Sequence, residues 1–335
     1  TGDLTMAELV IELARESYQT QVICLSGKPE SAADGYVRVA KPAPDPRTIL
    51  TTSLCKRRSL VHARFLLPEV SAAVDGADTD IFVADHCYMA ESVLASRRFR
   101  EEGESTLAVS TVVPEALVWK ATRGLVGRLD ARRIVRDELR VAQRAYSLGT
   151  YDAEEARFYA GRGIRRAHWL DLTLSPGRQA HIAESGPRLV FLGDRRWAPN
   201  QEAFETLIDW WPRIAEGIPE AQLCVVGARD PAAAVRPLPA GMADLGFVDD
   251  LDGMLASSRA LVAPIRTGGG VRVKILDAAR RGLPVVGTTA AVGSLSAVLD
   301  IGTFDDEVGF INSCRRYLLD RPAAVRDGSV LYDLN

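Results

Sequence analysis

The chain has 335 residues, of which 47% are hydrophobic and 25% charged, and its formal net charge is −3. This length exceeds what one ordinary core uses, so two domains of about 150 residues each are expected. The nearly balanced charge excludes an overall attraction to nucleic acid or anionic membrane, although it leaves peripheral membrane contact of one patch open. No apolar run approaches the roughly 20 residues that a membrane-spanning helix needs.

The cysteines are odd in number, scattered and without a C-x-x-C pair; they are Cys24, Cys55, Cys87, Cys224 and Cys314. This pattern predicts a reducing, cytoplasmic compartment, with no disulfide framework and no zinc site. No signal peptide is visible. An α/β domain usually begins with a strand, whereas this sequence opens on a helical pattern. We therefore expect an upstream strand to be missing from it.

Short apolar runs and amphipathic stretches alternate through the first half of the chain. The capping-box spacing of Thr5 and Glu8 predicts a helix over 5–17. Strands are predicted over 21–25, 36–39, 80–84, 107–111, 146–150 and 166–170, and helices over 68–74, 88–97, 128–145, 153–160 and from Pro114 onward. The rest of 27–57, rich in Gly, Pro, Ala and Asp, is predicted to be loop. Such alternation is typical of a parallel, doubly wound sheet.

Glycine and proline interrupt this pattern over 171–187, and we place a domain boundary there. The prediction is an N-terminal domain over 1–174, a C-terminal domain over 175–319, and a tail over 320–335 that crosses back onto the first domain. In the second half, strands are predicted over 189–193, 222–227, 245–248, 260–265 and 283–288, and helices over 199–215, 251–257, 271–281 and 307–319.

A triple glycine, Gly268, Gly269 and Gly270, stands between a predicted strand and the helix expected from Val271. Backbone N–H groups at such a turn are unpaired and lie at the positive end of the helix dipole, so the turn is a natural anion site. Arg272 and Lys274 add cations. The alternative is a flexible turn without a ligand. Neither the phosphate loop with Gly-Lys-Ser/Thr nor the G-x-G-x-x-G dinucleotide fingerprint is present.

Open α/β domains bind ligands at the carboxyl ends of their strands. In the second half these ends carry Gly193, Arg195 and Arg196 as well as the glycine loop, a set that suits a diphosphate. Asp277, one turn into the following helix, is placed to accept hydrogen bonds from a ribose, or else is a solvated carboxylate. In the first half, His86 and Glu115 follow two strands and face the predicted cleft. The alternative for His86 is a structural role.

Two further patterns are assigned no chemistry. Asp78-Thr79-Asp80 resembles a metal-binding D-x-D, but it precedes its strand and therefore lies on the side away from the cleft. Arginines alternate with Asp130, Asp137 and Glu138 along the helix predicted over 128–145. A solvated helix face is the preferred interpretation, and a patch that binds an acceptor or a membrane surface is the alternative.

Two stretches, LVFLGDRRWAPNQEAFETLIDWWPRIAEGIPEAQLCVVGA and GFVDDLDGMLASSRALVAPIRTGGGVRVKILDAARRGLPVVGT, resemble the nucleotide-sugar half of group-1 glycosyltransferases of family 4. The resemblance covers residues 188–300 and, more loosely, 80–175. It implies the GT-B fold, in which two Rossmann-like doubly wound domains face a central cleft. It also implies transfer of a sugar from a nucleoside diphosphate with retention, no obligatory metal and no cofactor.

The resemblance also assigns roles to residues. It places phosphate binding at Gly268 to Gly270, Arg272 and Lys274, ribose binding at Asp277, and a basic contact at Arg195 or Arg196. This chain departs from the family pattern at Gly269 and Asp277, where glutamates are common, and over 110–114, where many members carry a histidine.

The preferred hypothesis is a glycosyltransferase acting on an unidentified acceptor. Its catalytic residues are His86, Lys274 and Arg196, with His86 and Glu115 on the acceptor side. Its donor-binding residues are Gly193, Arg195, Arg196, Gly268, Gly269, Gly270, Val271, Arg272, Lys274 and Asp277. One alternative is a non-catalytic protein that binds nucleotide-sugars. The other is an epimerase, which would need a glutamate-rich cleft.

Overall fold

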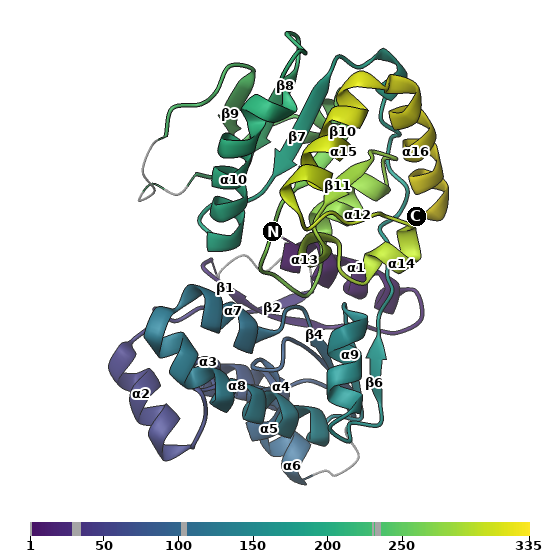
Figure 1. The fold of residues 1–335 in the computed structure, drawn as a ribbon. Helices are drawn as coiled ribbons and strands as arrows, with labels where there is room; N and C mark the ends of the chain where they lie inside the picture. Colours follow the sequence, from purple (N-terminus) through teal and green to yellow (C-terminus); the bar gives the residue numbers. More distant parts are fainter. Residues whose placement is uncertain (1, 29–34, 102–105, 230, 232–235) are drawn as a thin grey trace. The chain divides into compact units, whose positions relative to one another are not determined.

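The computed structural model describes residues 2–28, 35–101, 106–229, 231 and 236–335. Its contacts divide the chain into two compact units, Thr1–Leu170 and Asp171–Asn335. Both are α/β units with parallel strands (Figure 1). The predicted division after residue 174 falls just inside the C-terminal unit, and residues 320–335 cluster with that unit as well.

The N-terminal unit contains two parallel sheets. The first pairs β1 with β2, and the second has the order β3-β4-β5-β6, which follows the sequence. Its elements are α1 (Gly2–Arg15), β1 (Val22–Ser26), β2 (Tyr36–Ala40), α2 (Pro46–Cys55), α3 (Leu60–Arg64), α4 (Pro68–Asp75), β3 (Ile81–Asp85), α5 (Ala90–Ala95), α6 (Arg97–Glu101), β4 (Thr106–Thr111), α7 (Glu115–Thr122), α8 (Gly124–Arg144), β5 (Ser147–Thr150), α9 (Ala153–Ala160) and β6 (Ala167–Trp169).

The core of this unit lies against the four-stranded sheet. Leu107 and Leu148, on neighbouring strands β4 and β5, are fully buried and pack in one cluster with Val141 of α8 and Tyr159 of α9. Burying such side chains contributes about 1.5–3 kcal/mol each. The predicted strands therefore form where apolar runs are covered by helices, as expected for parallel sheets.

Two predictions for this unit were wrong. Helix α1 begins at Gly2, so Thr5 lies inside the helix and does not cap it. Residues 46–55, predicted to be loop, form α2, and Leu60–Arg64 form α3. The Asp45 carboxylate accepts hydrogen bonds from the N–H groups of Arg47 and Thr48, and Pro46 occupies the first helical position. An N-cap followed by proline starts a helix even in a stretch rich in loop formers.

The charges of α8 are separated between its two faces, so the acidic residues do not lie on the predicted solvated face. Asp130, Asp137 and Glu138 are buried. Asp137 accepts the Ser59 N–H at 2.6 Å and Asp130 accepts the Leu60 N–H at 2.7 Å, so these carboxylates hold the start of α3. Three arginines of α8, Arg133, Arg136 and Arg140, pair with these carboxylates, with Glu91 or with backbone carbonyls of the α2–α3 segment.

The C-terminal unit has one parallel sheet with the strand order β11-β10-β7-β8-β9. Its elements are the short 3₁₀ helix η1 (Ile182–Glu184), β7 (Arg188–Leu192), α10 (Ala198–Ile214), β8 (Gln222–Val226), β9 (Met242–Gly246), α11 (Leu251–Ala256), β10 (Ala260–Ala263), α12 (Val273–Ala279), β11 (Val285–Gly287), α13 (Thr289–Val292), α14 (Leu295–Leu299), α15 (Glu307–Leu319) and α16 (Arg321–Leu334).

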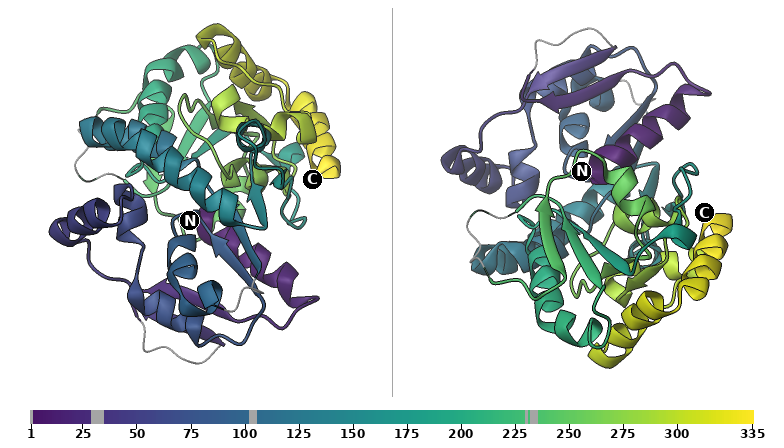
Figure 2. Two further views of the ribbon diagram at one scale, coloured as in Figure 1. Left: turned by 90° about the horizontal axis from the view of Figure 1, so that it is seen from below. Right: turned by 90° about the horizontal axis from the view of Figure 1, so that it is seen from above.

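The strand order of this sheet reverses at β7. The chain moves outward from β7 through β8 to β9, and then returns to the other side of β7 with β10. Helix α15 packs over β7, β10 and β11 and against α10, while α16 packs on α12, α14 and α15 (Figures 1 and 2). The point between β7 and β10, where the order reverses, is where open α/β sheets bind ligands.

Asp137→Ala is expected to destabilise the N-terminal unit by about 1–3 kcal/mol, because the buried Ser59 N–H loses its acceptor. Burial disfavours the charged carboxylate, but the Ser59 N–H, His62 and Arg136 hold the pKa of Asp137 below its ordinary value of 3.8. A depressed pKa stabilises the fold above that value, and this contribution is lost as the pH falls through the folded-state pKa.

Urea unfolding of both proteins at several pH values measures this contribution. The difference between wild type and Asp137→Ala should be largest near neutral pH and should shrink below about pH 4. The exposed Asp249→Ala variant is the control and should change stability by less than about 0.5 kcal/mol. An Asp137→Ala protein as stable as the control would contradict this role of Asp137.

Candidate functional site

Two turns meet at the carboxyl ends of β7 and β10, where the sheet order reverses. One is the turn from β7 to α10, Gly193 to Trp197, and the other is the loop from β10 to α12 with the triple glycine. A Cβ atom added at Gly268 would lie 3.7 Å from the Trp197 ring, so the loop packs on the turn. Both segments lie at these strand ends, and their predicted role in binding a diphosphate stays a prediction.

Lys274 lies at the centre of this arrangement. Its Nζ donates a hydrogen bond to Asn200 Oδ1 at 2.7 Å and stands 5.4 Å from the centroid of the Phe191 ring. The residue is half-buried. Desolvation by the surrounding protein lowers the pKa of Lys274 from its ordinary 10.5 to about 7. An ammonium has three donors, and Asn200 is the one acceptor described for it among the residues that the structure covers.

Asn200 ties Lys274 to the turn after β7. Its Nδ2 donates to the Asp194 carbonyl at 2.9 Å while its Oδ1 accepts from Lys274. Gly193 leaves room for this amide, because a Cβ at that position would lie 2.7 Å from Asn200 Cγ. Gly227, at the end of β8, has φ +131 and would place a Cβ 2.1 Å from the Gly193 carbonyl oxygen. Close backbone approach therefore requires glycine at both strand ends.

The glycine loop differs in one respect from its prediction. Helix α12 begins at Val273, whereas the expected start was Val271. Gly270 has φ +74, and Arg272 has φ −101 and ψ 58, so the chain becomes helical only after Arg272. Arg272 Nη1 donates to the Gly270 carbonyl at 2.7 Å, and its guanidinium lies over the backbone of Gly293. With seven residues, α12 supplies little dipole, and the charge at this turn comes from Lys274 and Arg272.

Three other residues predicted to bind the donor are already in ion pairs. Arg195 is buried and forms a two-point contact with Asp244 at 2.7 and 2.9 Å. The Arg196 side chain is 63% exposed and pairs with Asp194. The third residue, Asp277, contacts Arg280 at 3.0 Å and Arg281 at 2.9 Å. Arg196 is thus more accessible than Arg195. The donor-binding roles of Arg195, Arg196 and Asp277 stay predictions.

In the N-terminal unit the structure brings His86 and Glu115 together. His86 Nδ1 lies 3.7 Å from Glu115 Oε1, and the imidazole stacks on Tyr88 with ring centroids 4.7 Å apart. His86 follows β3 directly and has φ +72, a conformation that non-glycine residues rarely adopt. Such backbone strain is concentrated at functional sites, and here it turns the imidazole toward the start of α7.

The buried carboxyl group of Glu138 contacts this pair at Glu115. Glu138 of α8 accepts a hydrogen bond from the Glu115 backbone N–H, but burial and the nearby carboxylates of Glu155 and Glu115 raise its pKa well above the ordinary value of 4.5. The cluster of Glu115, Glu138 and Glu155 was not visible in the sequence, because its members come from three separate helices.

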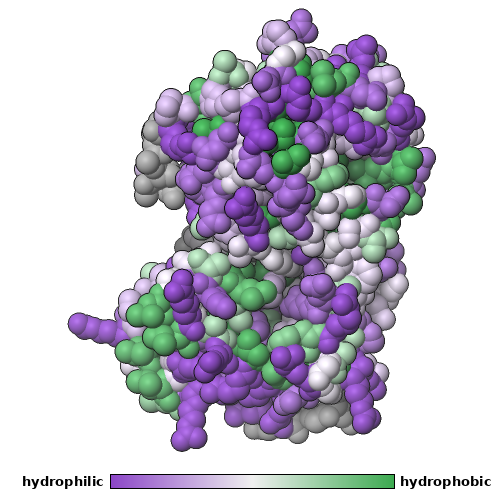
Figure 3. Space-filling view, viewed as in Figure 1, coloured by the Kyte–Doolittle hydropathy of each residue, from purple (hydrophilic) through white to green (hydrophobic). Residues whose placement is uncertain are grey.

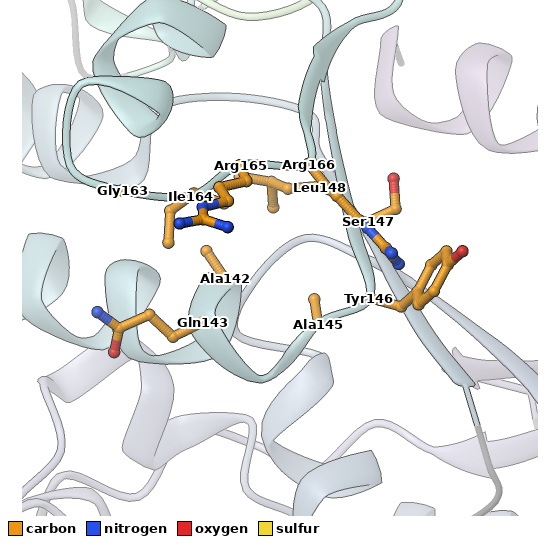
Figure 4. Close-up of a pocket in the computed structure, with 10 residues that line it drawn as sticks. All are labelled: Ala142, Gln143, Ala145, Tyr146, Ser147, Leu148, Gly163, Ile164, Arg165 and Arg166. Atoms are coloured by element: carbon orange, nitrogen blue, oxygen red, sulfur yellow. The ribbon is translucent and has the colours of Figure 1, made fainter.

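Two cavities lie away from the predicted site residues. A cavity of about 330 Å³ lies between the end of α8, the start of β5 and residues 163–166 (Figure 4). It opens at the amino end of β5, opposite the predicted site, and Arg166 stacks on Tyr146 at its rim. A second cavity, of about 370 Å³, lies beside η1 and α16. Neither contains a predicted site residue.

The described residues contain neither a membrane-spanning helix nor a metal-binding cluster. No helix among them is both long and apolar enough to cross a membrane. No group of three or more His, Cys, Asp or Glu side chains in the described part of the chain is arranged to hold a metal ion.

Comparison with known proteins bears on both units. Residues 186–315 match the family model described as glycosyl transferases group 1. No curated protein sequence matches the chain. Among solved structures, the chain is similar to sucrose-phosphate synthase from Thermosynechococcus elongatus, with 15% identity, coverage of 99% of this chain and 87% of that chain, and a TM-score of 0.69.

Two further structures are similar at comparable levels. HepE from Anabaena, in complex with UDP and glucose, has 12% identity, 94% coverage of each chain and a TM-score of 0.62. WaaG, a glycosyltransferase involved in lipopolysaccharide biosynthesis, has 14% identity, coverage of 99% of this chain and 90% of that chain, and a TM-score of 0.60. The match confirms the predicted resemblance to group-1 glycosyltransferases over residues 186–315, and the structural likeness confirms the GT-B fold. The cleft between the units stays a prediction.

Lys274 is expected to make stability depend on pH. With a folded-state pKa of about 7 and an ordinary value of 10.5, the unfolded chain binds more protons between these limits. Stability should therefore rise with pH across this window, by at most about 1.4 kcal/mol per pH unit. Lys274→Met should remove this component of the slope, and Asn200→Asp should reduce it because a carboxylate stabilises the ammonium. Denaturant unfolding between pH 6 and pH 10 measures it. Identical slopes in all three proteins would contradict the depressed pKa.

Proposed function

We propose that this protein transfers a sugar from a nucleoside diphosphate donor to an acceptor, with retention and without an obligatory metal. The observation that carries the proposal is the half-buried ammonium of Lys274 at the β7–β10 reversal, beside the triple glycine. The group-1 glycosyltransferase match covers this part of the chain. A predicted cytoplasmic location is consistent with five free cysteines.

A diphosphate would complete the hydrogen bonding of Lys274. Its oxygens supply acceptors for the two remaining ammonium donors, and its negative charge favours the protonated form. Negative charge grows on the diphosphate as the bond to the sugar breaks. A cation that is already placed and poorly hydrated stabilises this developing charge without reorganisation, which is usually the largest catalytic contribution. Arg272, whose guanidinium is fixed at the same loop, adds to this field.

The acceptor side is proposed to lie at the end of β3. His86 and Glu115 are adjacent there, in a pair that can hold or move a proton at the His86 imidazole. The family pattern has a histidine after the next strand, over 110–114, where this chain has none. His86 therefore carries the acceptor-side role in this proposal, with Glu115 orienting its ring.

Lys274→Met should lower turnover of a nucleotide-sugar by about 100- to 1000-fold, the range found when one stabilising donor is removed from a transition state. The exposed Lys41→Met variant is the matched control and should behave as wild type. The assay follows release of the nucleoside diphosphate from UDP-, GDP- and dTDP-sugars, with and without added saccharide or lipid acceptors.

Other outcomes of this assay decide between functions. Wild-type turnover in Lys274→Met would contradict the phosphate role of Lys274. Tight nucleotide-sugar binding with no turnover on any acceptor would indicate a non-catalytic binding protein. Isomerised donor without acceptor would indicate an epimerase.

A further inference from the structure

The helices α2, α7 and α8 form an exposed face that combines leucines with basic side chains. Exposed apolar residues on these helices are Leu50, Leu54, Leu117, Leu125, Val126 and Leu129. Exposed cations beside them are Lys56, Arg57, Lys120, Arg123, Arg128 and Arg132. We call these twelve residues the leucine–arginine surface. Figure 3 shows apolar and hydrophilic side chains gathered together over this region.

Helix α8 places both kinds of side chain on one stripe. Leu125 and Leu129 are 72% and 70% exposed, and with Arg128 and Arg132 they follow the i, i+3, i+4, i+7 spacing of a single helix face. The buried stripe of the same helix contains Asp130, Ile134 and Val141. The exposed leucines are therefore not an extension of the core.

The charge of this surface is almost entirely positive. All four acidic residues between 114 and 144, which are Glu115, Asp130, Asp137 and Glu138, are buried. Residues 46–58 contain no acidic residue. Hydrogen bonds from Arg133 to Ser53 and from Arg136 to the Arg57 carbonyl hold the α2 segment against α8, so the cations of both segments share one face.

We propose that the leucine–arginine surface docks on an anionic lipid bilayer. Exposed leucines enter the boundary between headgroups and acyl chains, while the surrounding Lys and Arg side chains contact anionic headgroups. Nucleic acid would use the cations but not the leucines. The centre of a protein–protein interface is usually depleted of charged residues, whereas the exposed stripe of α8 alternates leucines with arginines.

Docking of the leucine–arginine surface does not involve the donor site. One consequence of docking rests on the proposed function. Helix α7 begins at the buried Glu115 and carries Leu117 on its exposed side, so docking would place the acceptor-side pair one helix diameter, roughly 10 Å, from the bilayer surface. An acceptor attached to a lipid is the class that such docking would serve.

Flotation of the whole protein with vesicles tests the proposal. We expect binding to phosphatidylcholine vesicles that contain about one third phosphatidylglycerol, and little binding to pure phosphatidylcholine. Each Lys or Arg near an anionic membrane changes partitioning about fivefold, so Arg128→Glu with Arg132→Glu should weaken it by at least about 20-fold. Leu125→Ser with Leu129→Ser should also abolish flotation. Vesicle binding should weaken when the salt concentration is raised from about 0.1 M to about 1 M, because the Debye length then falls from about 10 to 3 Å.

The matched control is Arg326→Glu with Val330→Ser, an exposed pair at the same spacing on α16 of the C-terminal unit. It should bind vesicles as wild type does. All changed residues are exposed, so every variant should keep the wild-type thermal unfolding temperature and the wild-type rate of donor hydrolysis in solution.

Several results would overturn the proposal. Absence of binding to anionic vesicles, equal binding to neutral ones, or unchanged binding by both surface variants would each do so. A wild-type dimer that both surface variants convert to a monomer would show that a second copy covers this surface. Because the readout is vesicle binding, failure here leaves the test of Lys274 turnover unaffected.

Discussion

The hydrogen bond between Lys274 and Asn200 joins the two turns that form the candidate site of the C-terminal unit, one after β7 and one after β10. It spans the point where the strand order reverses between β7 and β10. Asn200 is fixed by the Asp194 carbonyl and by the space that Gly193 leaves, and Lys274 is fixed by Asn200 and the Phe191 ring. The position of the ammonium is therefore set by the fold before a ligand arrives, which is the condition for electrostatic stabilisation of a transition state.

The two units handle charge in related ways. In the C-terminal unit desolvation lowers the pKa of Lys274, and a bound anion would favour the charged ammonium. In the N-terminal unit the carboxylates of Asp130 and Asp137 are turned inward to hold α3, and burial raises the pKa of Glu138, which accepts the Glu115 N–H. Because the acidic side chains of α8 are buried, its exposed face carries arginines and leucines. One arrangement of charges thus supports both the internal packing and the basic surface.

The sequence predicted what local patterns encode. Most strands, the long helix α10 opened by Pro199 and the Asp152 cap of α9 follow from spacing and capping rules. Contacts between distant segments could not be predicted in this way. Asn200 was missed because its partner lies 74 residues further on, although an asparagine in the first turn of a helix, after a glycine turn, was a usable signal. The pairing of Arg195 with Asp244, and the inward acids of α8, likewise depend on tertiary packing.

Proton uptake on binding of UDP tests the central claim most directly. Calorimetric titration at pH 8, in buffers with different enthalpies of ionisation, measures the number of protons that accompany binding. If the pKa of Lys274 is about 7 in the free protein and rises when a diphosphate contacts it, wild type should take up about 0.9 proton, and Lys274→Met should take up none. Binding without proton uptake, or equal uptake by both proteins, would contradict the claim that this ammonium receives the diphosphate.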